Sequence, residues 1–372
     1  MRLRSRLAVS LAAASLALAG CASGGGDTSS SGSASGSTTG ESSGETSTAD
    51  VCADANGDGP AIGLAYDVGG RGDQSFNDSA YAGLTKAVEE LDATCQEAEA
   101  QAGETDADRE QRLRDLIDAG YDTLIGVGFV YSVAVYNVAP DYPDVNFGII
   151  DGFNPTDTDL ENVANIGFAA NEASFLVGAV AALTTKSDNV GFVGGTNTPL
   201  IQSFEVGYNA GVAEIDPKIE IQSQYLSQDD PVKGFENTAG GQTAATGMLD
   251  NGADVVYHAA GKSGLGVFEA VVGAGKGTWA IGVDSDQYLT ADPKTKPFIL
   301  TSALKRVDTG VFEFAQGVAD GKPPAGYVTY DLADGGVDYA TSNKALSPKV
   351  VAQVDELKQR IIDGDIKVPT GL

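Results

Sequence analysis

Histidine and cysteine are almost absent from this chain, and their scarcity limits the chemistry that it can perform. The 372 residues include one histidine, His258, and three cysteines, Cys21, Cys52 and Cys95. Zinc sites and Ser-His-Asp or Cys-His nucleophilic sites depend on these residue types, so we expect no metal site and no cofactor. An acid–base enzyme that uses carboxylates stays open, because the chain has 52 acidic residues. Such a number is more typical of a solvated acidic surface.

Positive charge is scarce as well. Lysine and arginine together number 23, which leaves a formal net charge of -29 at pH 7. A surface of this sign repels nucleic acid and anionic lipid head groups. We therefore expect neither of them as a partner.

Long hydrophobic runs are missing beyond the N-terminus. Arg2, Arg4 and Arg6 precede an apolar run over 7–18, which is too short to span a bilayer as a permanent helix. A charged start followed by a short apolar run predicts a signal peptide over residues 1–20. No later apolar run is long enough to cross a membrane, so we expect membrane attachment only through a lipid.

Residues 18–21 read Leu-Ala-Gly-Cys and resemble the lipobox of bacterial lipoproteins. The resemblance implies cleavage before Cys21 and attachment of more than one acyl chain there, since one chain binds a membrane only marginally. The alternative is an ordinary signal peptide with an incidental cysteine. Residues 21–59 are rich in Ser, Gly and Thr and predict a flexible tether, with the folded body beginning near Pro60.

Cys52 and Cys95 remain after the proposed anchor. An even pair outside the cytoplasm predicts a disulfide that joins the start of the body to its first helix. Two unpaired thiols are the alternative, because spacing alone does not show that the two Cα atoms come close enough.

Short apolar strands alternate with amphipathic helices through the body. Strands are predicted at 61–66, 123–127 and 145–150. A helix with apolar residues at helical spacing covers 80–91, and a second one ends at Gly120. This alternation predicts an α/β fold, with parallel strands and helices on both faces of the sheet.

The pattern then restarts, which indicates two similar doubly wound lobes. The matching segments keep the same order: 190–195 echoes 61–66, 203–211 echoes 75–83, 248–256 echoes 116–124, and 280–284 echoes 147–151. We assign residues 60–165 plus about 287–320 to the N-terminal lobe. Residues 166–286 plus about 321–372 form the C-terminal lobe.

Acidic and aromatic residues follow the predicted strands of both lobes. Asp67, Asp151 and Asp284 each come directly after an apolar strand, and Phe76 and Phe204 lie in the loop after the first strand of each lobe. Ligands of open α/β sheets bind beyond the carboxyl ends of the strands. Two facing lobes therefore predict a shared cleft with paired aromatics and carboxylates, closed by a hinge when ligand binds.

Residues 72–78, Gly-Asp-Gln-Ser-Phe-Asn-Asp, resemble the D-x-S-F-N signature of the basic membrane protein family, the purine-nucleoside-binding lipoproteins of ABC importers. Further stretches resemble the same family: 142–151, 172–178, 191–195, 199–208, 282–287 and 301–305. The resemblance covers roughly residues 60–320. It implies a type I periplasmic-binding-protein fold, a purine nucleoside between the lobes, delivery to ABC permease subunits, a monomeric state and no catalysis.

The resemblance also implies roles for eight residues, named by their numbers in this chain. Phe76 and Phe204 would stack on the two faces of the base, and Asn77 and Asp151 would read its hydrogen-bonding edge. Asp67, Gly261, Asp284 and Lys305 would hold the ribose or order the cleft around it. More ordinary readings stay open: the two Phe as core residues, Asp284 as a helix N-cap, and Lys305 as a surface charge.

Two alternative functions remain. A sugar receptor has the same fold, and a nucleoside-hydrolysing enzyme would use the carboxylates of the cleft.

Residues 261–266, Gly-Lys-Ser-Gly-Leu-Gly, lack the spacing of a phosphate-binding Walker loop. We read them as a turn that lets backbone approach the ligand.

Overall fold

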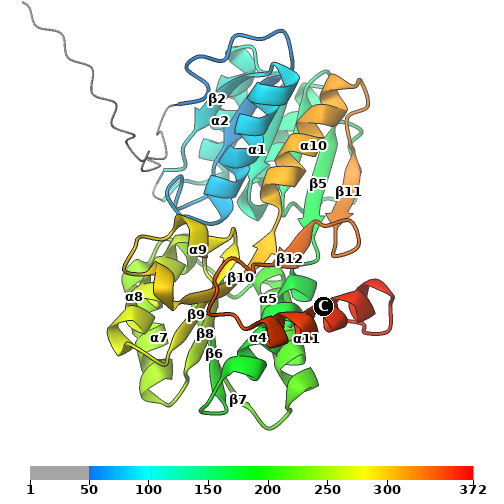
Figure 1. Ribbon diagram of the computed structural model, residues 1–372. Coiled ribbons are helices and arrows are strands. Elements are labelled where there is room, and N and C mark those ends of the chain that lie inside the picture. Colours follow the sequence, from blue (N-terminus) through cyan, green and yellow to red (C-terminus); the bar gives the residue numbers. More distant parts are fainter. Residues whose placement is uncertain (1–49, 102, 372) are drawn as a thin grey trace, which may run out of the picture. The chain divides into compact units, whose positions relative to one another are not determined.

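The structure is a computed structural model, which describes residues 50–101 and 103–371. The predicted signal peptide 1–20, Cys21 and the tether up to residue 49 lie outside the described residues. Two six-stranded sheets organise the described part of the chain (Figure 1). No helix within this part has the length and apolarity needed to span a membrane.

The first sheet is parallel throughout. Its strands lie in the order β11 (Gly326–Tyr330), β5 (Val163–Phe168), β4 (Asn146–Ile150), β3 (Thr123–Val127), β1 (Ala61–Ala65) and β2 (Thr94–Ala98). Strand β1 shows why these segments are strands. Ile62 and Leu64 belong to one core cluster and Ala65 to another, so alternate side chains are buried on opposite faces of the sheet.

Helices cover both faces of this first lobe. They are α1 (Phe76–Leu91), α2 (Asp106–Asp118), α3 (Ser132–Val138) and α10 (Val307–Ala319), with 3-10 turns η1 (Phe129–Tyr131) and η2 (Ala139–Asp141). Helices α1 and α10 pack together on one face, and α2 and α3 pack together on the other. Helix α2 has a capping box between Thr105 and Asp108, and Gly120 follows its end in the left-handed conformation, with φ 99°.

The second sheet repeats this plan with one antiparallel edge. Its order is β12 (Val337–Tyr339), β10 (Ile299–Lys305), β9 (Trp279–Asp284), β8 (Val255–Ala259), β6 (Asn189–Thr196) and β7 (Glu220–Ser227), with β12 antiparallel to β10. Its helices are α4 (Ala170–Thr184), α5 (Pro199–Ile215), α6 (Pro231–Phe235), α7 (Thr238–Asp250), α8 (Gly264–Ala274), α9 (Gln287–Thr290) and α11 (Pro348–Ile362), with η3 (Gly261–Ser263) and η4 (Lys296–Phe298). The predicted fold class is confirmed.

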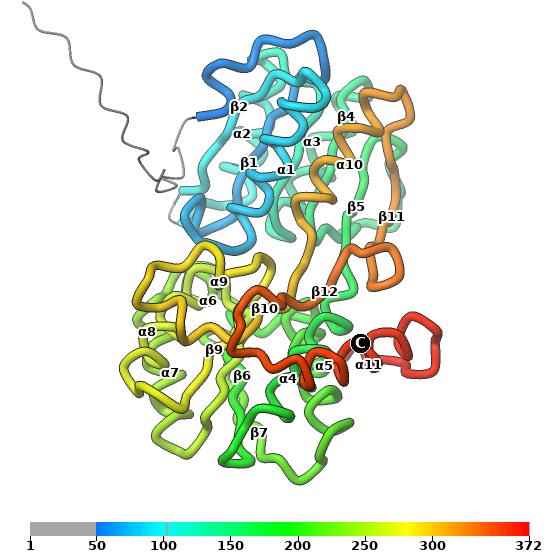
Figure 2. The backbone as a smooth tube through the Cα atoms, in the orientation of Figure 1, coloured from blue at the N-terminus to red at the C-terminus, as the bar shows by residue number. Residues whose placement is uncertain are grey.

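The chain passes between the two lobes three times (Figure 2). It crosses from β5 to α4, from β10 to α10, and from β11 to β12. The lobe boundaries therefore differ from the predicted ones, by three residues at the end of β5 and by whole strands at two further places. Strand β10 lies in the second sheet, although 287–320 was assigned to the first lobe, and β11 lies in the first sheet, although 321–372 was assigned to the second. Sheet membership depends on pairing between distant strands, which a short apolar run does not encode.

The start of the body also differs from the prediction. Cys52 is bonded to Cys95, with 5.0 Å between the two Cα atoms, so the predicted disulfide is present. Cys95 lies in β2, however, and not in the first helix. Val51, Cys52 and Ala55 pack against the core, so the last ten residues of the predicted tether belong to the folded body.

Candidate functional site

One cavity lies between the carboxyl ends of the two sheets and encloses about 540 Å³ of empty space, part of it open to solvent. All eight predicted site residues line it: Asp67, Phe76, Asn77, Asp151, Phe204, Gly261, Asp284 and Lys305. The other lining residues are Val68, Asp73, Gly128, Phe129, Leu200, Ile201, Phe235, Ala259, Ala260 and Val283. The structure thus brings together every residue that the sequence nominated, from both lobes.

Asp67 follows β1 and is 7% exposed. Its Oδ1 accepts a bond from the Val68 N–H at 2.6 Å, and its own N–H donates to Asn77 Oδ1 at 3.1 Å. Burial raises the pKa of Asp67 to about 7, while the Val68 N–H and the charge of Arg109 oppose the rise. Gly128 lies against this carboxyl with φ 101°, and a Cβ there would come within 2.2 Å of Asp67 Oδ2. Only glycine fits beside this carboxyl.

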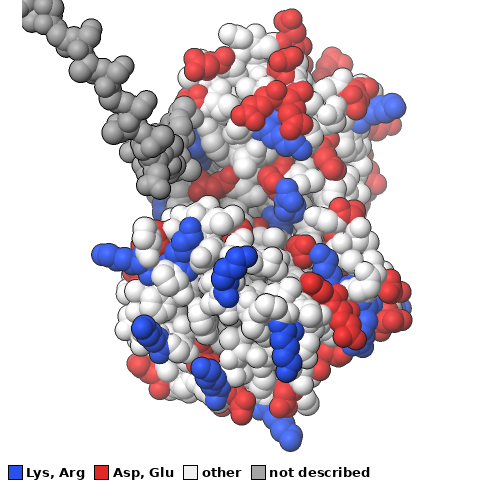
Figure 3. Space-filling view, in the orientation of Figure 1, with Lys and Arg blue, Asp and Glu red and all other residues white. Residues whose placement is uncertain are grey.

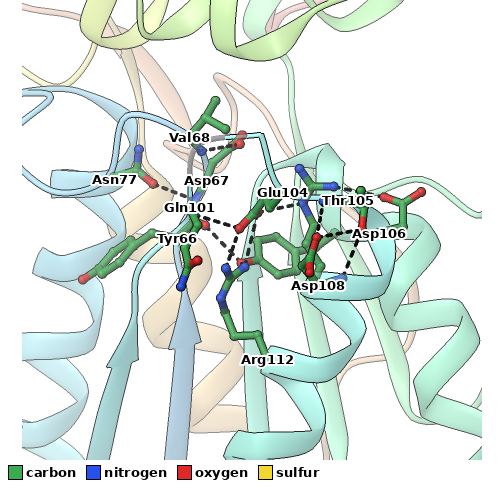
Figure 4. Close-up of polar contacts among 12 residues, drawn as sticks. Tyr66, Asp67, Val68, Asn77, Gln101, Glu104, Thr105, Asp106, Asp108 and Arg112 are labelled. Atoms are coloured by element: carbon green, nitrogen blue, oxygen red, sulfur yellow. Dashed lines mark hydrogen bonds and ion pairs between the residues drawn. The ribbon is translucent and has the colours of Figure 1, made fainter.

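A buried polar network lies behind Asp67 (Figure 4). The Glu104 side chain is 2% exposed and forms ion pairs with Arg109 and Arg112. Arg112 donates to the Tyr131 hydroxyl at 2.8 Å, and that hydroxyl donates to the Tyr66 carbonyl at 3.1 Å. The network therefore anchors the backbone directly before Asp67 and fixes the end of β1.

Lys305 and Asp151 form an ion pair across the two lobes. Their side chains are 3% and 4% exposed, so both charges are removed from water. The Lys305 ammonium lies 4.7 Å from the centre of the Phe76 ring and 5.7 Å from that of Phe204. Asp151 Oδ1 is buried without a hydrogen-bond partner and is available to a ligand donor.

Asp151 and Asp284 occupy equivalent positions of the repeat. Asp151 directly follows β4 and Asp284 is the last residue of β9, and both adopt the left-handed conformation, with φ 58° and 62°. Asp284 accepts a bond from Ser75 Oγ of the other lobe at 2.6 Å, and Ser285 Oγ donates to the Ser75 carbonyl at 3.0 Å. Burial raises the pKa of Asp284, and the nearby Lys305 charge and the Ser75 hydroxyl oppose the rise. The lobes therefore touch directly beside the cavity.

Phe76 and Phe204 lie in helices, and not in loops as predicted. Phe76 is the first residue of α1, whereas Phe204 lies more than one turn inside α5 and is 3% exposed. The two rings approach the cavity from different lobes. Gly261 contributes backbone to the wall, because it begins η3 with φ 50° next to Phe235.

One group of possible metal ligands occurs among the described residues, namely Asp50, Cys52 and Glu97. Cys52 Sγ is already in the disulfide, so this group is not a metal centre. His258 is fully buried in β8 against Phe268, and burial lowers its pKa to about 3. It does not line the cavity.

Several residues that line the cavity were not predicted from the sequence. Asp73 stood inside the matched motif 72–78, and an Asp shortly before a helix is a capping signal that could have identified it. Phe235 ends the five-residue helix α6, which has no periodic pattern to reveal it. Phe129, Leu200 and Ile201 read as ordinary core residues.

Two α/β lobes that meet at the carboxyl ends of their strands, around a cavity with aromatic and charged walls, define a two-lobed solute-binding protein. Residues 62–371 match the family described as ABC transporter substrate-binding protein, PnrA-like, and the chain belongs to this family. The predicted family is therefore confirmed. ABC transporter substrate binding is the function of the class.

The matches to three relatives cover most of this chain and most of each relative. A CD4+ T-cell-stimulating antigen of Listeria monocytogenes is 37% identical, over 83% of this chain and 87% of its own. An ABC transporter nucleoside-binding protein BmpA of Lactococcus lactis is 35% identical, over 82% and 88%. Basic membrane protein A of Borreliella burgdorferi is 31% identical, over 84% and 88%.

Solved structures share the fold. An ABC transporter solute-binding protein of Aeropyrum pernix superposes with a TM-score of 0.69 at 30% identity, over 83% of this chain and 94% of that one. A second solute-binding protein, from Conexibacter woesei, has a TM-score of 0.67 at 22% identity, over 84% and 99%.

Proposed function

We propose that this protein is an extracytoplasmic receptor, anchored by a lipid on Cys21, that captures a purine nucleoside and delivers it to the permease of an ABC importer. The observation that carries the proposal is the pair of aromatic rings, Phe76 and Phe204, that reach one cavity from two lobes. A planar base presents two faces, and stacking on aromatic side chains does not depend on the identity of the base. The relative named as nucleoside-binding supports the same ligand class.

The polar residues of the cavity fit the remaining parts of a nucleoside. Asn77 and Asp151 offer an amide and an unpartnered carboxylate oxygen to the edge of the base. Asp67, Asp284 and Lys305, with the backbone of Gly261, form the charged part of the wall that would hold the ribose hydroxyls. Four carboxylates against one ammonium also disfavour a phosphorylated ligand.

The receptor's own steps in transport make and break no covalent bond. Ligand enters between the lobes, the lobes close on it, and the closed monomer docks on the permease. The contacts from Ser75 to Asp284 and from Ser285 to Ser75 already join the lobes and would stabilise the closed form.

The first experiment is mass spectrometry of small molecules released by denaturing the purified protein. Calorimetric titration with adenosine, guanosine, inosine and ribose then ranks the ligands. We expect a purine nucleoside to be released and ribose to bind much more weakly. Ribose binding as tight as nucleoside binding would favour the sugar receptor instead.

Catalysis and anchoring have separate tests. Asp67, with a pKa of about 7, is the group that a nucleoside hydrolase would use as an acid, so release of hypoxanthine from inosine is measured. Catalytic turnover would overturn the transport proposal.

Cys21→Ser should move the protein from the detergent phase to the aqueous phase, and unchanged partitioning would exclude Cys21 as the anchor.

A further inference from the structure

Helix α1 is capped by Asp73, which is not the residue directly before the helix. The Asp73 carboxylate accepts bonds from three backbone N–H groups, those of Ser75 at 2.9 Å, Asn77 at 2.9 Å and Asp78 at 3.2 Å. N–H groups at the start of a helix have no partner inside it, so a carboxylate here satisfies them. Ser75, at the usual capping position, uses its hydroxyl for Asp284 of the other lobe.

Asp73 also holds a side chain of the cavity. Asn77 Nδ2 donates to Asp73 Oδ2 at 3.1 Å. Asn77 Oδ1 accepts the Asp67 N–H at 3.1 Å (Figure 4). Asp73 and Asn77 are 1% and 2% exposed, so water does not replace these bonds. Burial raises the pKa of Asp73 to about 6, which leaves it ionised at neutral pH.

These two neighbours allow only one orientation of the Asn77 amide. An ionised carboxylate only accepts hydrogen bonds and a backbone N–H only donates them, so a flipped amide would face an acceptor with its oxygen and a donor with its nitrogen. The allowed orientation leaves one Nδ2 hydrogen and one Oδ1 lone pair for a ligand. The donor and the acceptor that Asn77 offers therefore have fixed places in the cavity.

Fixed places matter because purines differ in this pattern. A 6-oxopurine has a donor at N1 and an acceptor at position 6, whereas a 6-aminopurine has an acceptor at N1 and a donor at position 6. In one pose of the base, a fixed amide satisfies one of these patterns and opposes the other. We propose that Asp73 is a positioning residue that sets the selectivity between 6-oxo and 6-amino purine nucleosides by fixing the Asn77 amide. This inference rests on the proposed function.

The test compares Asp73→Ala with a matched control, Asp78→Ala. Asp78 accepts the backbone N–H groups of Gly72 and Gln74 in the same turn but makes no bond to the Asn77 side chain. Calorimetry gives the ratio of the dissociation constants of inosine and adenosine. We expect Asp73→Ala to move this ratio about fivefold to tenfold toward one. This is the change in relative affinity that the loss of one hydrogen bond causes. The control should lower both affinities by a common factor.

A ratio that is unchanged in Asp73→Ala would reduce Asp73 to a helix cap and overturn the proposal. Equal affinities for inosine and adenosine in the unmodified protein would overturn it too, and would leave the proposed function intact. Binding of neither nucleoside would overturn the proposed function together with its selectivity.

A measurement without ligand checks the positioning separately. The side-chain amide signal of Asn77 in nitrogen-15 NMR is assigned by its loss in Asn77→Asp. One Nδ2 hydrogen should exchange slowly with water in the unmodified protein and in Asp78→Ala, and rapidly in Asp73→Ala. Equal exchange in all three proteins would show that Asp73 does not hold the amide. The same NMR spectra show whether the alanine variants are folded.

Discussion

The two lobes share a plan but divide the cavity unequally between polar and apolar surface. The first lobe contributes Asp67, Asp73, Asn77 and Asp151 among its eight lining residues. The second lobe contributes ten lining residues, of which only Asp284 and Lys305 have charged or amide side chains. One lobe therefore offers most of the hydrogen-bonding groups, and the other offers mostly apolar surface.

The difference begins at two equivalent helix starts. Helix α1 follows β1 through a turn in which Asp73 and Asn77 bond to each other and to backbone. Helix α5 follows β6 with the ordinary cap Thr198, then Pro199 in the first turn, and Leu200 and Ile201 in the cavity wall. A repeated fold can thus keep its strands and change its recognition chemistry in a few residues.

Surface charge separates the lobes as well. Residues 60–168 and 307–330 contain 24 acidic and 6 basic residues, whereas 169–306 and 331–371 contain 22 and 14. On the face shown in Figure 3, acidic side chains gather on the first lobe, and basic ones are spread over the second. A permease that contacts both lobes would therefore meet two surfaces of different potential.

The largest effect should come from breaking the ion pair that joins the lobes. Lys305→Met leaves the buried Asp151 carboxylate without its partner, which should lower the free energy of unfolding by about 3–5 kcal/mol. Urea unfolding measures the loss. The control is Lys358→Met, whose pair with Asp338 is partly exposed and should cost less than about 1 kcal/mol.

Restoring neutrality sharpens this result. Lys305→Met combined with Asp151→Asn removes both charges and should regain part of the lost stability. A double variant less stable than Lys305→Met alone would contradict the explanation by an unpaired buried charge.

A smaller effect should follow removal of the disulfide, which only the first lobe possesses. Cys52→Ser with Cys95→Ser should lower the free energy of unfolding by about 2–4 kcal/mol. Hydrogen exchange read by mass spectrometry should rise mainly in peptides from β1 and β2. An equal rise in the second lobe would show that the disulfide stabilises both lobes together.

The aromatic pair should show the next effect, and it should be similar for both lobes. Phe76→Ala and Phe204→Ala should each weaken purine nucleoside binding about tenfold to a hundredfold, since base stacking contributes roughly 1 to 3 kcal/mol. The loss should be alike for adenosine, guanosine and inosine in calorimetry. Phe153→Ala is the control, because Phe153 is 44% exposed and does not line the cavity. Full affinity in both variants would remove the stacking role.

A dependence of stability on pH should originate in the polar lobe. Burial raises the pKa of Asp67 from 3.8 to about 7, so its favourable contribution is complete below the unfolded pKa and is lost as the pH rises through 7. The urea midpoint should fall between about pH 4 and 7, and Asp67→Asn should flatten this fall. Asp108→Asn is the control, because helix capping lowers the pKa of Asp108 below this window. An unflattened fall in Asp67→Asn would mean that other groups cause it.

The strands and the repeat could be predicted because central strands of a parallel sheet are buried on both faces and read as short apolar runs. The carboxylates Asp67, Asp151 and Asp284 were accessible to the same reasoning, because ligands bind at the carboxyl ends of strands. The sequence did not predict which lobe contains β10, because the apolar run of this strand fits either sheet. Phe235 was missed because α6 is too short to have a period.

The three passages of the chain between the lobes have a consequence for how the protein is made. Strand β11 pairs with β5 in the first sheet, Gly326 opposite Ala164, after the whole of 170–305 has been laid down in the second lobe. A nascent chain that ends near residue 306 lacks β11 and α10 of one lobe and β12 and α11 of the other. Contacts between such distant segments form late in folding. Neither lobe is then complete until the segments after residue 306 have emerged, because these segments contribute to both lobes.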